Sequence, residues 1–85
     1  MDVSKGRVVE RVARVLAGQR LSANAKGDAA SAGAAVDAEW HNHVNDAIAV
    51  LKTLREPDAH MAAAGDPAVW ERMVLAALDE SSGPA

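Results

Sequence analysis

Residues 36–56, VDAEWHNHVNDAIAVLKTLRE, carry the clearest helical pattern in the chain and decide its fold class. Their apolar residues recur every three or four positions and therefore share one face of a helix. These residues are Val36, Trp40, Val44, Ala47, Leu51 and Leu54. Asp37 and Glu39 lie early, where the positive end of the helix dipole favours acids, and Pro57 ends the pattern because proline lacks an amide donor. The pattern predicts one long helix over 36–56.

The preceding segment combines an amphipathic stretch with a run of small residues. Between Val8 and Leu16 the valines and leucines fall on one side at helical spacing, which predicts a helix over 3–18 that ends at Gly18. Residues 22–35, SANAKGDAASAGAA, offer no side chain that would anchor a core, which favours a flexible linker. The alternative is that the alanines of this segment extend the following helix backwards.

Two short helices are predicted after Pro57. Asp58 is a good N-cap for a helix over 58–64. Asp66-Pro67 then starts a helix over 66–79, with an aspartate cap and a proline at the first helical position.

No segment shows the strict alternation of a half-buried strand. Residues 80–85, ESSGPA, are expected to form a frayed tail. The whole chain, 1–85, is therefore predicted to be a single all-α domain. It would be a small helical bundle of about four helices, two long and two short, with a flexible Ala/Gly/Ser loop between the first two.

The composition predicts a thin core. Hydrophobic residues make up 49% of the 85 residues, but 20 of these 42 residues are alanine, which buries little apolar area. A chain this short gains stability from a partner surface, so a homodimer is the favoured state. The alternative is a marginally stable monomer.

Two tryptophans on apolar helix faces are the natural anchors of such a dimer, because tryptophan is prominent at interface hot spots. Packing inside the chain's own core is the alternative role for both. The candidate interface residues are Trp40, His43, Leu51, Leu54, Trp70 and Met73.

The net charge of −3 is unevenly distributed. Residues 1–28 carry six basic and three acidic side chains, whereas residues 29–85 carry three basic and nine acidic ones. Arg7, Arg11 and Arg14 share one helix face, which is a candidate contact face for phosphates or for an acidic partner. The alternative is a solvated basic helix that lies on an acidic remainder.

The stretch EWHNHVND contains two of the three histidines, His41 and His43. Residues two apart on a helix point to nearly opposite sides, so this pair is not expected to bind one metal ion. A helical metal pair needs a spacing of four, as in H-E-x-x-H. Histidines at the edge of the core or of an interface are the favoured interpretation.

No other motif indicates catalysis. The serines lie in the N-terminal segment, the predicted linker and the tail, and no glycine-rich turn surrounds any of them. We therefore expect no catalytic residues, no metal ligands, no cofactor and no enzymatic activity.

A set of spaced residues from Trp40 onward forms a distinctive order. They are Trp40, Ala47-Ile48, Leu54-Arg55-Glu56-Pro57, Met61, Ala64-Gly65, Val69-Trp70, Met73 and Ala76-Ala77-Leu78. This order, with the preceding amphipathic stretch from Glu10 to Leu16, resembles a family of short, largely uncharacterised helical proteins of alphaproteobacteria and their phages or prophages. The resemblance implies a helical fold, with no known enzymatic function or cofactor. His41 and His43 are not part of its pattern.

The chain has no cysteine, no signal-peptide pattern and no apolar run long enough to span a membrane, so we expect a cytoplasmic protein without membrane contact. The function predicted from the sequence is a non-catalytic helical interaction or accessory module that acts as a homo-oligomer, with an unknown protein partner. The alternative is a phage- or operon-linked regulator that binds nucleic acid through Arg7, Arg11 and Arg14.

Overall fold

The structure is a computed structural model that describes residues 6–25 and 29–82. Its helical segments are α1 (Val8–Ala25), α2 (Ala29–Glu39), the 3₁₀ turn η1 (Trp40–His43), α3 (Val44–Leu54), α4 (Ala59–Ala64) and α5 (Pro67–Ser82). The described residues form no strand, and the predicted all-α class, a small helical bundle, is confirmed.

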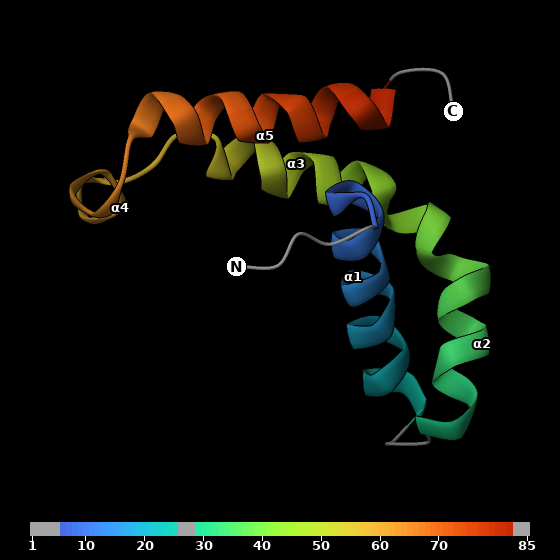
Figure 1. Cartoon of the computed structure of the whole chain (residues 1–85). Coiled ribbons are helices and arrows are strands. Elements are labelled where there is room, and N and C mark those ends of the chain that lie inside the picture. The colour runs from blue at the N-terminus through green and yellow to red at the C-terminus, as the bar shows by residue number, and fades with distance from the viewer. Residues whose placement is uncertain (1–5, 26–28, 83–85) are drawn as a thin grey trace.

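The helices form two arms that meet at a corner. In Figure 1, α1 and α2 lie side by side as a hairpin, while α3 and α5 lie side by side across one end of that hairpin. The short α4 lies at the outer end of the α3–α5 arm. The radius of gyration is 15.0 Å, whereas a compact chain of this length has about 12 Å. The protein is therefore more open than a typical domain of its size.

The corner lies inside the stretch that predicts one long helix. α2 ends at Glu39 and α3 begins at Val44, and the four residues between them form η1. The backbone of His43 has φ −109° and ψ 7°, away from α-helical geometry. The prediction of one straight helix over 36–56 is thus corrected. The chain stays helical but bends at η1, which packs against α1.

The segment predicted as a linker, 22–35, is helical wherever it is described. α1 continues to Ala25 and α2 begins at Ala29, while residues 26–28 lie outside the described residues. Residues 29–35 follow the alternative interpretation, since they extend the next helix backwards as α2, whereas residues 22–25 extend α1 forwards. Alanine is the strongest helix former, which favours both extensions.

The predicted end of the first helix at Gly18 is also corrected. Gly18 lies within α1, and a Cβ atom placed on it would lie 3.8 Å from Val36 Cγ2 of α2. A glycine inside a helix costs only about 0.5–1 kcal/mol, which the packing of α1 against α2 offsets. Residues 3–5 of the predicted helix lie outside the described residues, and α1 begins at Val8.

The two caps predicted in the C-terminal half are both formed. The carboxylate of Asp58 accepts a hydrogen bond of 2.8 Å from the Met61 amide, and that of Asp66 accepts one of 2.9 Å from the Ala68 amide. α5 extends beyond the predicted 66–79 to Ser82, so the predicted tail is helical at residues 80–82. Residues 83–85 lie outside the described residues.

The core lies where α1 crosses the α3–α5 arm. Ala13 and Ala47 are fully buried there, and such small residues allow α1 and α3 to approach closely. The buried residues of the described chain are Val9, Ala13, Ala17, Ala47, Leu51 and Val74. Half of them are alanines, so the predicted thin core is present. Among the described helices, none combines the length and the apolar character that crossing a bilayer requires.

Candidate interaction surfaces

An apolar groove lies between α4 and α5. Its volume is about 420 Å³. It is lined by Pro57, Met61, Ala64, Gly65, Asp66, Pro67, Val69, Trp70 and Met73. Asp66 is the one charged residue in this lining, and its carboxylate is engaged in capping α5. The groove therefore presents mostly carbon to solvent.

Three aliphatic side chains of the groove are exposed. Met73 has 62% of its surface exposed, Met61 has 40% and Val69 has 39%. Their exposure leaves apolar area in contact with water, which is unfavourable by about 25 cal/mol per Å². A contiguous exposed apolar surface on a soluble chain is typical of an interaction site.

Trp70 forms the inner wall of the groove and ties α5 to α3. Its indole Nε1 donates a hydrogen bond of 2.7 Å to the backbone oxygen of Leu54. This bond satisfies the only polar atom of the ring, so the exposed part of the indole carries no unpaired donor. It also occupies a carbonyl near the end of α3, which would otherwise lack an intrahelical partner.

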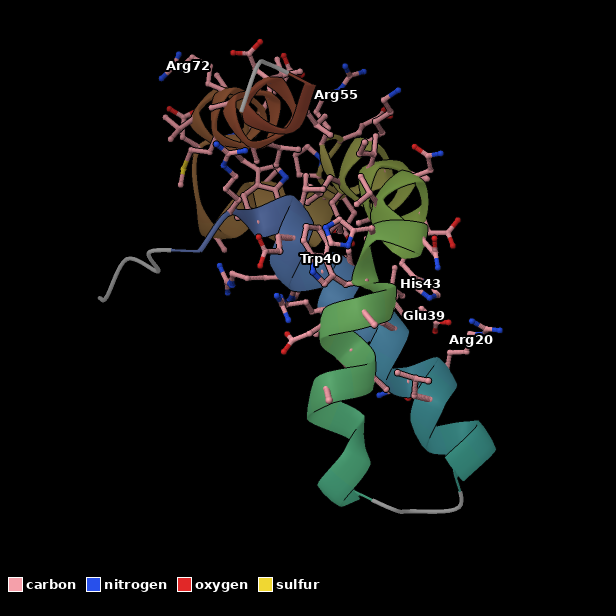
Figure 2. The ribbon with its side chains drawn as sticks, turned by 90° about the vertical axis from the view of Figure 1, so that its right-hand side faces the viewer. Arg20, Glu39, Trp40, His43, Arg55 and Arg72 are labelled. Carbon is pink, nitrogen blue, oxygen red and sulfur yellow. The ribbon has the colours of Figure 1, made fainter. Side chains whose placement is uncertain are left out.

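A second cluster of polar side chains lies at the corner. Arg20 of α1 donates a hydrogen bond of 2.7 Å to Glu39 Oε1 at the end of α2. The other oxygen of Glu39 lies 3.7 Å from His43 Nε2 in η1. Figure 2 shows these three side chains along one side of the molecule, with Arg55 and Arg72 above them on the α3–α5 arm. The cluster links α1 to both sides of the bend.

Trp40 occupies the inside of the corner. Its ring stacks on His41, with centroids 3.7 Å apart and an interplanar angle of 29°. The guanidinium carbon of Arg14 lies 5.3 Å from the Trp40 ring centroid, within the range of a cation–π interaction. Trp40 also packs against the buried core. The residue that opens η1 thus connects α1 to the bend.

The predicted basic face is partly neutralised. Arg14 donates hydrogen bonds of 2.6 Å to Asp37 and 2.8 Å to Glu10. The bonds to Asp37, and then to Glu10, raise the pKa of Arg14 above its ordinary value. Arg7 and Arg11 are exposed. Arg14 therefore binds two carboxylates of its own chain, one on α1 and one on α2.

The six predicted interface residues fall into three places. Trp70 and Met73 line the groove, and the carbonyl of Leu54 contacts Trp70. Trp40 and His43 lie at the corner. Leu51 is only 5% exposed and belongs to the chain's own core. The structure thus separates the candidates that the helical pattern places on one face.

Several residues that build the groove and the polar cluster at the corner are not predictable from the helical pattern. Met61, Pro57 and Gly65 of the groove come from a six-residue helix and its flanking turns, where no helical period is measurable. Arg20 and Glu39 are 19 residues apart, so no local spacing indicates that they pair. The exposed methionines near a tryptophan are the one signal that points to the groove.

The histidines do not form a metal cluster within the described chain. No group of three or more His, Asp or Glu side chains lies close enough there to hold a metal ion. His60 is exposed on α4. The chain matches no protein-family model, no curated protein and no solved structure. The resemblance to helical proteins of alphaproteobacteria and their phages stays a prediction.

Proposed function

We propose that the protein is a non-catalytic helical interaction module that works as a homo-oligomer. One observation carries the proposal, which is the excess of exposed surface. The chain has a solvent-accessible surface of 6361 Å², whereas a compact monomer of 8.8 kDa has about 4,800 Å². The excess of about 1,600 Å² is larger than the area of about 800 Å² that each partner buries in a standard interface.

The thin core supports the same conclusion. No described side chain of large volume is fully buried, and three of the six buried residues are alanines. Full burial of one large apolar side chain stabilises a fold by about 1.5–3 kcal/mol, so covering the exposed Met73 and Val69 would add substantially to the stability of this small chain. Association therefore completes a core that the single chain leaves open.

The polar clusters of the described residues serve packing. Arg14 and Arg20 each bind a carboxylate of the opposite helix, and these pairs hold the α1–α2 hairpin together. The charges of Arg14 and Arg20 are thereby offset inside the chain, which supports a structural role for these two arginines.

Sedimentation velocity between about 1 and 100 µM tests the proposal. We expect a species of twice the chain mass, and an unfolding midpoint in urea that rises with protein concentration because only the folded chain associates. A chain that sediments as a monomer at every concentration, with a midpoint independent of concentration, would contradict the proposal.

A further inference from the structure

We propose that the groove between α4 and α5 is the surface through which two copies of the chain pair about a two-fold axis, with Met73 of each copy entering the groove of the other. The inference rests on the proposed self-association and locates it. It commits to a second copy of this chain as the occupant.

The groove offers both parts that a self-complementary contact needs. In a two-fold interface the same patch appears on both partners, so it must contain a hollow as well as a projection. The hollow measures about 420 Å³, and the projection is Met73, with 62% of its surface exposed at the groove's edge. Methionine suits this position because its unbranched side chain adapts to an irregular cavity.

The groove contains few polar side-chain groups. Interface cores are depleted of charge, and Asp66 is the single charged residue in this lining. Its carboxylate already accepts the Ala68 amide. The indole Nε1 of Trp70 is bonded to the Leu54 carbonyl. Burial beneath a second copy therefore leaves these groups with the hydrogen bonds they already make.

The helices that form the walls of the groove are preorganised within the single chain. The Asp58 cap fixes the start of α4, the Asp66 cap fixes the start of α5, and Trp70 joins α5 to the end of α3. A preorganised surface loses less conformational entropy on binding than a mobile one.

The lining favours an apolar protein surface over a small molecule. Small-molecule sites contain a few polar groups that orient the ligand. Here the only polar side-chain atoms are the capped carboxylate of Asp66 and the bonded indole nitrogen of Trp70. The chain as a whole exposes about 1,600 Å² more than a compact monomer of its mass, which exceeds the area of about 800 Å² that each partner buries in a standard interface.

The chain offers a matched pair of variants. Met73 and Val15 are both 62% exposed, both lie within long helices, and Val15 lies on α1 in the other arm. In a two-fold dimer the substitution Met73→Glu puts a charge into the interface twice. We expect it to raise the dimer dissociation constant by about 100-fold or more, whereas Val15→Glu changes it by less than about threefold. Sedimentation equilibrium measures both constants, and circular dichroism checks that the variants remain helical.

A cross-linking measurement gives an independent readout. The chain contains no cysteine, so Met73→Cys introduces the only thiol. In the two-fold contact we propose, Met73 lies beside the axis, which brings two such thiols within the Cα separation of about 4.4–6.8 Å that a disulfide requires. We expect Met73→Cys to form a disulfide-linked dimer under oxidised glutathione, and Val15→Cys to remain a monomer on a non-reducing gel. This readout decides the matter if Met73→Glu fails to fold.

The outcomes separate the two proposals. A wild-type chain that stays monomeric overturns both the proposed function and this inference. A wild-type dimer that Met73→Glu leaves intact overturns the groove alone. Dissociation by Val15→Glu as well as Met73→Glu indicates head-to-tail contacts between different patches and also overturns the two-fold groove. Dissociation by Met73→Glu alone, with cross-linking through Met73→Cys, supports it.

Discussion

Glu39 Oε2 lies 3.7 Å from His43 Nε2, one helical turn further along, and neither atom has a hydrogen-bond partner among the described residues although both are buried. The other oxygen of Glu39 binds Arg20. Glu39 thus holds α1 on one side and approaches the ring of His43 on the other without completing a hydrogen bond to it.

A neutral side chain of the same shape is expected to serve at this position. In Glu39→Gln the amide oxygen accepts from Arg20 and the amide nitrogen is available to donate toward His43. The free energy of unfolding should change by less than about 0.5 kcal/mol, because the pair with the exposed Arg20 contributes little as a charge interaction. Glu39→Ala removes both contacts and should lower it by about 1–2 kcal/mol. Urea unfolding followed by circular dichroism at one protein concentration measures both, and equal losses would contradict this account.

Gly18→Ala is expected to stabilise the protein. Gly18 lies within α1, and the added methyl group would make an ordinary contact with Val36 at 3.8 Å. Replacing a helical glycine by alanine raises the free energy of unfolding by about 0.5–1 kcal/mol. Gly33→Ala in α2 is the matched control, since its methyl group would meet no atom within 4 Å. Thermal unfolding should show the larger rise for Gly18→Ala. A fall in stability for that variant would indicate that α1 ends at Gly18.

Leu51 and Leu75 should respond differently to the same truncation. Leu51 is 5% exposed in the core, whereas Leu75 on α5 is 40% exposed. Leu51→Ala should lower the free energy of unfolding by about 2–5 kcal/mol, which approaches the whole stability of so small a domain. Leu75→Ala should lower it by less than about 1 kcal/mol, because exposed leucine loses less buried area. Loss of helical signal at 25 °C in Leu51→Ala alone is the expected result, and comparable losses in both variants would contradict the assigned core.

The cap of α4 is expected to control the wall of the groove. Asp58→Ala removes the acceptor of the Met61 amide and should reduce the protection of the α4 amides in hydrogen exchange by about 1 kcal/mol. Asp58→Asn retains a capping oxygen without the charge and should keep that protection. A loss of similar size in both variants would show that charge, rather than the hydrogen bond, holds α4.

Local chemistry made several features predictable from the sequence. The aspartate caps at Asp58 and Asp66 were predictable because a cap depends only on residues two or three positions away. The all-α class followed from the apolar period of residues 36–56 and from the abundance of alanine. Such signals act within one turn of helix, where sequence and structure are closely coupled.

The bend and the division of the candidate interface were not predictable in the same way. A straight helix would place Trp40 and Leu54 on one face. Because the chain bends at η1, Trp40 lies at the corner and Leu54 lies at the end of α3. That turn packs against α1, which ends 15 residues before η1 begins. The pairing of Arg20 with Glu39 has the same non-local origin.

The corner contains neither glycine nor proline, since the residues from Val36 to Val44 are VDAEWHNHV. Sharp helix bends usually have such a residue as their cause. Here η1 packs against α1, and we infer that the first helix sets the bend. A peptide of residues 29–54 alone would lack the contact with α1, so we expect it not to keep the angle between α2 and α3. The first helix contacts both sides of the bend, so a substitution at the α1–η1 contact is expected to change the angle between the α1–α2 hairpin and the α3–α5 arm.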